Sequence, residues 1–336
     1  MAADAREYHD PEYLVEVSHL NKYFPIKSGV FRATVGHVKA VDDISFHIRQ
    51  GKTMGLVGES GCGKTTAGRT ILRLLQPTAG EVLFDGQNVM KLDKRSLRRL
   101  RTQMQIIFQD PYSSLNPRLP VMDIVGEAIL EHKLARNRKE MQQQVISVIE
   151  QCGLSADQAL RYPHQFSGGQ RQRICIARAL ALHPRFIVCD EAVSALDVSI
   201  QSQIINLLKD MQDAMHLSYL FISHDLSVVK FISDDVGVMY LGQMVEMGSK
   251  KQIFENALHP YTEALLGAAP SFDPTQRNSR RIILEGDIPS PANPPSGCRF
   301  HTRCPLARDI CKEKAPEYKE LEPGHFVMCH KANGVF

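Results

Sequence analysis

The sequence lacks three features that would each point to a large class of proteins. No apolar run reaches the roughly 18 residues that a membrane-spanning helix needs, so we expect any membrane role to come through partner proteins. Positive charge is not in excess, since 40 Lys and Arg face 37 Asp and Glu, which argues against a nucleic-acid protein with a broad basic surface. The first ten residues are polar and acidic, unlike a secretory signal. We therefore expect a soluble, cytosolic protein.

The order of elements along the 336 residues indicates an α/β fold. Short apolar runs with polar breaks over residues 13–57 predict antiparallel strands, and the run 54–57 predicts a buried strand. Residues 110–180 show helical spacing, and further strands are expected near 186–189 and 219–222, with a hairpin over 236–247. Strands that alternate with helices predict a mainly parallel core. After about residue 270, a proline-rich linker leads to a tail that contains four cysteines.

A glycine-rich segment after the predicted strand 54–57 has the spacing G-x-x-x-x-G-K-[ST]. Backbone N–H groups in such a loop surround an anion, and the following helix adds its positive N-terminal end. Lys64 is expected to contact the β- and γ-phosphates of a nucleotide, and the Thr65 hydroxyl to bind Mg²⁺. The candidate nucleotide-binding residues here are Gly58, Ser60, Gly61, Cys62, Gly63, Lys64, Thr65 and Thr66.

Two carboxylates, Asp190 and Glu191, end a run of four apolar residues. Such a pair alone is usually a solvated strand end, but its place downstream of a phosphate loop favours a catalytic role. Asp190 is then expected to hold Mg²⁺, directly or through water, and Glu191 to polarise the attacking water as general base. This arrangement predicts ATP hydrolysis.

The segment Ser167, Gly168, Gly169 and Gln170 begins a predicted helix. Ser-x-x-Gln is also a capping-box pattern, and that interpretation stays open. The two glycines weaken a first helical turn, which makes sense if backbone N–H groups must face a phosphate. Because the loop at 58–66 already holds a nucleotide, we expect this segment to cover the γ-phosphate held by a partner subunit in a dimer.

Taken together, the ordered motifs over residues 13–255 resemble the nucleotide-binding subunit of the ATP-binding cassette (ABC) transporter superfamily. The resemblance implies a P-loop NTPase cassette with a RecA-like parallel core, an antiparallel β-subdomain and a helical subdomain at about 110–180. Residues 1–255 would form this nucleotide-binding domain and 256–336 an irregular cysteine-containing extension. Head-to-tail dimers that sandwich two ATP molecules are also implied.

The same resemblance assigns roles to single residues that the motifs alone would leave open. Adenine stacking falls to Phe24, with Tyr23 as the alternative. Gln109 matches the residue that touches Mg²⁺ and senses the membrane domains, and His224 matches the switch histidine at the γ-phosphate. Asp197 matches the residue that links the two sites across the dimer. Phe166 and the pair Ala192-Val193 depart from common superfamily residues without removing a chemical group.

Within the superfamily, the chain resembles the ATP-binding subunits of oligopeptide and dipeptide importers. The resemblance is carried by residues 108–117, 190–199 and 259–266 and by the proline-rich, cysteine-containing tail. It implies a pair of different ATPase subunits, of which this chain resembles the second. It also implies two membrane-spanning permease subunits and an extracytoplasmic substrate-binding protein, with this chain on the cytoplasmic face of a bacterial-type membrane. Nickel and glutathione importers share these motifs, and a soluble ABC ATPase or a redox sensor is the alternative from a different class.

The four tail cysteines, Cys298, Cys304, Cys311 and Cys329, are separated by five, six and seventeen residues. No pair has the tight spacing common in structural zinc sites. Cys304 precedes a proline, as in some iron–sulfur ligand runs. The family resemblance suggests a [4Fe–4S] cluster, with zinc or no metal as alternatives, and His301, His325 or His330 could replace one ligand.

Overall fold

The computed structural model describes residues 10, 12–29, 33–268 and 286–336, which form two compact units. The first unit comprises residues 1–48, 53–90 and 223–336, and the second comprises 49–52 and 91–222. Most of the predicted proline-rich linker, residues 269–285, lies outside the described residues. Within the described ranges, no helix is both long and apolar enough to span a bilayer.

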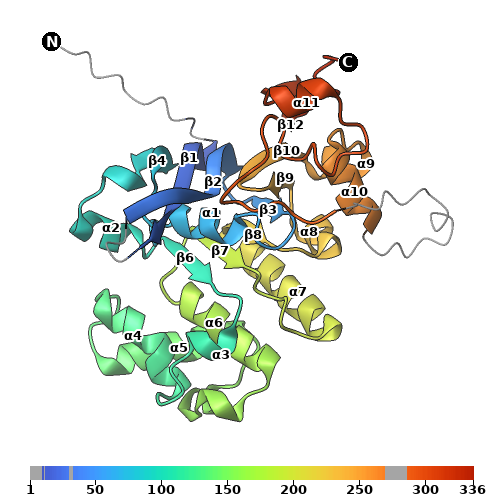
Figure 1. Ribbon diagram of the computed structural model, residues 1–336. Helices are drawn as coiled ribbons and strands as arrows, with labels where there is room; N and C mark the ends of the chain where they lie inside the picture. The colour runs from blue at the N-terminus through green and yellow to red at the C-terminus, as the bar shows by residue number, and fades with distance from the viewer. Residues whose placement is uncertain (1–9, 11, 30–32, 269–285) are drawn as a thin grey trace. The chain divides into compact units, whose positions relative to one another are not determined.

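An antiparallel sheet with the strand order β2-β1-β4-β5 lies in the first unit (Figure 1). Its strands are β1 (Tyr13–Ser28), β2 (Ala33–Arg49), β4 (Ala79–Phe84) and β5 (Gln87–Asn88). Ile44, Phe46 and Ile48 on β2 are all buried, which is the period-2 pattern of a strand with one face in the core. Antiparallel strands are expected over residues 13–57; they are present up to residue 49, whereas residues 53–57 form a parallel strand of another sheet.

A second sheet in the first unit contains the strand that leads into the phosphate loop. β3 (Thr53–Val57) pairs in parallel with β9 (Asp235–Tyr240), and β9 forms the expected hairpin with β10 (Gln243–Ser249). All five residues of β3 are buried. The helices of this unit are α1 (Lys64–Ile71), α8 (Leu226–Ile232), α9 (Lys250–Glu255), α10 (Pro260–Ala268) and α11 (Asp309–Glu313), and the 3-10 turn η1 (Val89–Lys91) follows β5.

The C-terminal extension is more regular than the sequence predicted. β11 (Tyr318–Glu322) and β12 (His325–Met328) form a hairpin, and β12 pairs antiparallel with β10. The fully buried Glu246 of β10 accepts a hydrogen bond from His325 Nε2 of β12 at 2.8 Å. A buried pair of this kind explains why a short, charged segment extends the sheet of the first unit, where its composition indicated irregular structure.

The second unit combines three parallel strands with a group of helices. β6 (Met104–Ile107), β7 (Phe186–Asp190) and β8 (Ser218–Ile222) lie side by side in that unit, with β7 between the other two. Its helices and 3-10 turns are α2 (Lys94–Leu100), α3 (Pro111–Ser114), α4 (Val121–Glu131), α5 (Arg138–Gln151), η2 (Ala156–Leu160), η3 (Pro163–Gln165), α6 (Gly168–Leu180) and α7 (Val198–Met215).

Helices α4, α5 and α6 pack against one another, and α3 packs against α6 (Figure 1). On α5, the buried residues Met141, Val145, Val148 and Ile149 recur at intervals of four, three and one, which places them on one face. The helices from α3 to α6 occupy residues 111–180, the range in which the sequence predicts a helical region.

Candidate active site

The phosphate loop connects β3 to α1, and its glycines adopt backbone conformations that other residues rarely reach. Gly58, Gly61 and Gly63 have φ values of 150°, 80° and 107°. A Cβ on Gly58 would lie 2.2 Å from the Met239 carbonyl oxygen, and one on Gly63 would lie 1.9 Å from the Ala40 carbonyl oxygen. Only glycine fits at these two positions, because backbone atoms occupy the space where a side chain would begin.

Lys64 is buried at the start of α1, and its ammonium group donates to the Gly58 carbonyl at 2.7 Å and the Glu59 carbonyl at 3.0 Å. No side chain caps the N-terminus of α1, and its first turn contains no acidic residue. A helix start of this kind favours an anion. Thr65 and Thr66 lie in this first turn, whereas Ser60 and Gly61 are exposed on the loop.

Cys62, which the sequence predicts to bind nucleotide, has its side chain buried in the protein. Burial raises the pKa of its thiol, and the thiol lies 3.6 Å from the Lys64 ammonium. The Cys62 carbonyl accepts a backbone hydrogen bond from Gly242 at 2.9 Å. Its own backbone N–H donates to the Glu59 carbonyl at 3.3 Å, so in this structure both backbone groups and the thiol of Cys62 make contacts within the protein.

The two aromatic candidates for adenine stacking have different surroundings. Phe24 is 36 % exposed, and the Lys22 ammonium lies 4.7 Å from the centre of its ring. The Tyr23 hydroxyl donates to Asp42, and burial together with this bond raises the Tyr23 pKa to about 12. The exposed ring of Phe24 is thus the one with a face open to a base.

In the second unit, Gln109 and Glu191 meet at the ends of neighbouring parallel strands. Gln109 Nε2 donates to Glu191 Oε2 at 3.0 Å. Ile107 of β6 pairs with Cys189 of β7, and Gln109 and Glu191 each lie two residues after this pair. Asp190 is the last residue of β7 and is 2 % exposed. The structure therefore brings together three residues that the sequence assigned to Mg²⁺ and to the attacking water.

Residues Ser167 to Gln170 begin α6 with the capping box that the sequence left as an alternative. The Ser167 hydroxyl accepts from the Gln170 N–H at 3.3 Å, and the Gln170 side chain accepts from the Ser167 N–H at 3.1 Å. A Cβ on Gly169 would lie 2.5 Å from Ile200 of α7, whereas one on Gly168 would find an ordinary contact. Gly169 is therefore required for packing within the unit. Ser167 and Gly168 are exposed, so their outer surface is open to a partner.

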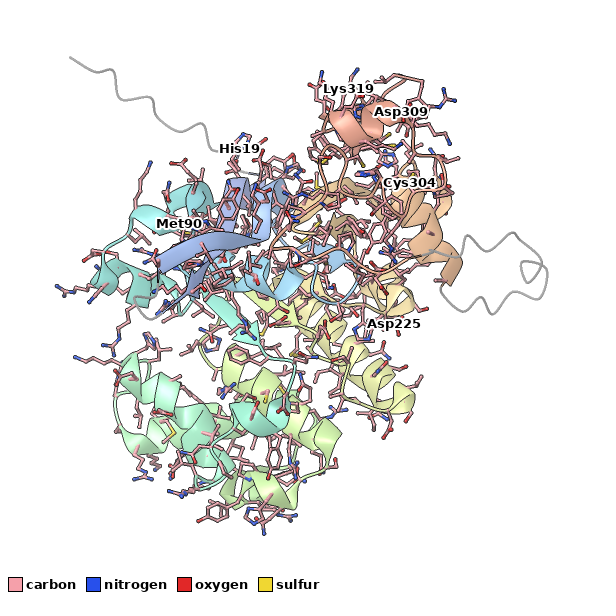
Figure 2. All side chains as sticks on the ribbon, viewed as in Figure 1. His19, Met90, Asp225, Cys304, Asp309 and Lys319 are labelled. Atoms are coloured by element: carbon pink, nitrogen blue, oxygen red, sulfur yellow. The ribbon has the colours of Figure 1, made fainter. Side chains whose placement is uncertain are left out.

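Two further predicted residues lie at helix starts. Asp197 is the residue before α7, is exposed, and makes no capping hydrogen bond with its side chain. His224 is exposed just before α8 in the first unit. Its neighbour Asp225, labelled in Figure 2, caps that helix by accepting from the Ser227 N–H at 2.8 Å. Capping by Asp225 fixes the backbone on which His224 is carried.

The four tail cysteines line one cavity in the extension, together with His259, His301 and His330. Figure 2 labels Cys304 in this region, along with Asp309 of α11 and Lys319 of β11. Burial, with smaller contributions from the three other cysteines, raises the Cys298 pKa to about 12. Across the described ranges, however, no three His, Cys, Asp or Glu side chains are grouped so that they could hold a metal ion. The expected four-cysteine metal centre is thus not supported by this arrangement.

Two arginines of the extension that no sequence pattern predicted also contact candidate nucleotide-binding elements. Arg299 and Arg303 are each adjacent to a cavity cysteine, and both make hydrogen bonds to parts of the first unit distant in sequence. Tyr261 was also missed, although its hydroxyl accepts from the Glu59 N–H of the phosphate loop at 2.9 Å. No local pattern marks these three residues, since their partners lie about 200 or more residues away.

Comparisons with known proteins identify the family and the fold. Residues 41–194 match the family "ABC transporter", and residues 245–311 match "Oligopeptide/dipeptide transporter, C-terminal region". The structure of cbiO1 from Clostridium perfringens, part of the ABC transporter complex cbiONQ, has a TM-score of 0.62 at 26% identity, covering 73% of this chain and 92% of its own. A dimeric ATP-binding cassette bound to ADP and Pi has a TM-score of 0.63 at 26% identity, covering 70% and 98%.

The fold and the phosphate-binding motifs define an ATP-binding cassette, and the chain belongs to the ABC transporter family. Within that family its relatives are ATP-binding proteins of peptide transport. The chain is 54% identical to the oligopeptide transport ATP-binding protein AppF of Bacillus subtilis (strain 168), over 95% of this chain and 97% of the relative. It is 50% identical to a putative peptide import ATP-binding protein of Brucella ovis, over 95% and 98%.

Proposed function

We propose that this chain is the ATP-hydrolysing subunit that powers the import of oligopeptides or dipeptides through a membrane ABC transporter. The observation that carries the proposal is the Gln109–Glu191 hydrogen bond, which holds a carboxylate at the strand ends where a general base is needed. The choice of peptides as substrates is supported by the relatives, which align with nearly the whole chain and whose names refer to oligopeptide transport and peptide import.

In the proposed mechanism, Lys64 exchanges its bonds to the Gly58 and Glu59 carbonyls for the β- and γ-phosphate oxygens of ATP. The N–H groups at the start of α1 bind the same phosphates, and the ring of Phe24 stacks on the adenine. Glu191 accepts a proton from the attacking water, and Gln109 orients the Glu191 carboxylate. His224 is proposed to contact the γ-phosphate.

The residues proposed to hold Mg²⁺ are Thr65, Gln109 and Asp190, all of which offer the oxygen ligands that this ion prefers. The nearly buried carboxylate of Asp190 fits the role, because a cation would compensate a charge removed from water. When bound, the ion supplies positive charge that stabilises the phosphate oxygens.

The proposal includes a dimer with a second, different ABC ATPase subunit. Ser167, Gly168, Gly169 and Gln170 would cover the nucleotide of the partner subunit, and Asp197 would link the two sites. The exposure of Ser167, Gly168 and Asp197 supports this role. Two permease subunits and an extracytoplasmic binding protein complete the proposed importer, with this chain at the cytoplasmic face of the membrane.

For the extension, we propose a metal centre bound by Cys298, Cys304, Cys311 and Cys329, with [4Fe–4S] ahead of zinc. The chemistry fits, because Cys304, Cys311 and Cys329 line the same cavity as Cys298 and help to raise the pKa of Cys298, and a bound cation would offset the negative charge of the thiolates. Because the described residues form no ready-made ligand group, the four side chains would have to turn towards one another. Iron and sulfide analysis of anaerobically purified protein tests this, and stoichiometric zinc without sulfide would contradict the cluster.

The import function is tested by ATP turnover of the complex extracted from its own membrane through a tag on this chain. Peptides presented with the binding protein should stimulate turnover. Glu191→Gln should retain ATP binding but hydrolyse ATP at least about a hundredfold more slowly. The exposed Glu150 provides a matched control, since Glu150→Gln makes the same charge change away from the site. Basal ATP turnover that peptides do not stimulate would indicate that the imported substrate is nickel, glutathione or another solute.

A further inference from the structure

A short turn in the extension, residues 298–304, carries two arginines that reach nucleotide-binding elements of the first unit. Arg303 grips the phosphate loop, since its Nη1 and Nη2 donate to the two carboxylate oxygens of Glu59 at 2.7 and 3.0 Å. The Arg303 side chain is 6% exposed and that of Glu59 23%. A bidentate pair this well shielded from water is stronger than an exposed ion pair.

Arg299, four residues earlier, contacts β2, the neighbour in the sheet of the strand β1 that contains the adenine candidates. Its guanidinium donates to the Asp42 carboxylate and to the Leu241 carbonyl, and the residue is buried. Asp42 in turn accepts the hydroxyl of Tyr23, the residue next to Phe24. One turn of the extension is thus bonded directly to the phosphate loop and, through Asp42, to Tyr23 on the strand that carries the candidate adenine contact.

The turn is itself rigidly held. Phe300 is 1% exposed, and its ring centre lies 5.3 Å from those of both Tyr240 and Tyr261. The Cys298 N–H donates to the Cys311 carbonyl at 2.8 Å. Both ends of the turn, Cys298 and Cys304, line the cysteine cavity. The two arginines are therefore presented from a packed support.

Glu59 is fixed at three separate groups. Tyr261 accepts from its N–H at 2.9 Å, Lys64 donates to its carbonyl at 3.0 Å, and Arg303 holds its carboxylate. A loop already held in one conformation loses less conformational entropy when a ligand binds. Arg303 also neutralises a carboxylate that stands inside a loop designed for anions, and so reduces repulsion of the triphosphate.

We propose that Arg303 and Arg299 are positioning residues for the nucleotide, and that the cysteine-containing extension sets the affinity of this cassette for ATP. Arg303 acts by holding and neutralising Glu59, and Arg299 by holding the Asp42–Tyr23 pair. The extension thereby becomes a working part of the nucleotide site. This inference requires ATP binding by the phosphate loop and is independent of what the four cysteines hold.

The test is the ATP dissociation constant of the full-length chain in its complex, together with KM and kcat. Arg303→Ala should raise Kd and KM for ATP about tenfold or more, because it removes two charge-assisted hydrogen bonds, while kcat at saturating ATP changes less than twofold. Arg303→Lys keeps the positive charge but cannot donate two parallel hydrogen bonds to Glu59, so it should raise Kd and KM by a smaller factor. In the extension, Lys312→Ala breaks the exposed pair with Asp309 and should leave both constants unchanged.

A double-variant cycle separates positioning from a general loss of structure. In a Glu59→Gln background, Arg303→Lys should shift Kd by less than twofold, because the partner carboxylate is already gone. If Arg303→Ala does not fold, the Arg303→Lys cycle alone decides the question. The proposal is overturned if Kd stays within twofold of wild type in the folded Arg303 variants, or if the effects of Glu59→Gln and Arg303→Lys simply add.

Discussion

Two glycines of the phosphate loop offer a matched pair of substitutions. Gly61 and Gly63 both have positive φ, at 80° and 107°, so alanine is conformationally strained at either position. They differ in the space around them: a Cβ on Gly61 would meet nothing within 4 Å, whereas a Cβ on Gly63 would lie 1.9 Å from the carbonyl oxygen of Ala40. The difference in stability between the two alanine variants therefore measures the cost of the clash with the Ala40 carbonyl.

The expected magnitudes follow from these two terms. The left-handed conformation costs an alanine about 1–2 kcal/mol, and this is the whole cost expected for Gly61→Ala. Gly63→Ala adds a steric clash that forces β2 and the loop to separate by about 1 Å, and overpacking of this kind costs a further 1–3 kcal/mol or so. We expect a total of about 2–5 kcal/mol for Gly63→Ala.

The assay is urea unfolding without nucleotide, followed by circular dichroism because the chain has no tryptophan. ATP binding by the same two proteins gives a second readout, in which Gly63→Ala should be the weaker binder, since separation of the loop from β2 displaces the start of α1. Equal losses of unfolding free energy in the two variants would refute the reasoning, because the backbone approach at Gly63 would then carry no cost.

Two more outcomes are expected. Gly169→Ala should lower the unfolding free energy by about 1–3 kcal/mol through its clash with Ile200, and Gly168→Ala should be nearly neutral; urea unfolding of both checks this, and an equal effect would contradict it. Burial lowers the His259 pKa from 6.5 to about 4, so the folded protein favours the neutral ring. The contribution of neutral His259 to the free energy of unfolding is fully present above pH 6.5 and is lost as the pH falls towards 4. The free energy of unfolding should therefore decrease by about 2 kcal/mol between pH 7 and pH 5. A His259→Asn variant should lack that part of the pH dependence, as measured by urea unfolding of both proteins at pH 7 and pH 5. If the wild type and the variant differ in unfolding free energy by the same amount at both pH values, His259 is not the cause.

The candidate-site residues whose structural setting sequence patterns predicted are those whose contacts are local. The phosphate loop, the strand that ends in Asp190 and the start of α6 each combine a glycine or carboxylate pattern with a predicted strand or helix beside it. Backbone conformation and the ends of parallel strands then bring Gln109 to Glu191 without further information. The capping box of α6 was equally readable, since its two partners are three residues apart.

The C-terminal extension was harder to predict because its structure depends on distant partners. β12 is short, and it becomes a strand through pairing with β10 and through the buried contact of His325 with Glu246. The bonds of Arg299 and Arg303 reach back 257 and 244 residues. An arginine beside a cysteine has no periodicity or motif that specifies such a partner, and only the folded backbone supplies it.

The sequence separation between Glu59 and Arg303 also has a consequence for synthesis of the chain. Translation at about 5–20 residues per second means that Arg303 is added about 12–50 seconds after Glu59. During that interval the nascent chain has a phosphate loop whose carboxylate has no arginine to neutralise it. The newly made subunit would then reach its full affinity for ATP only after the extension has been synthesised, and not when the cassette sequence alone is complete.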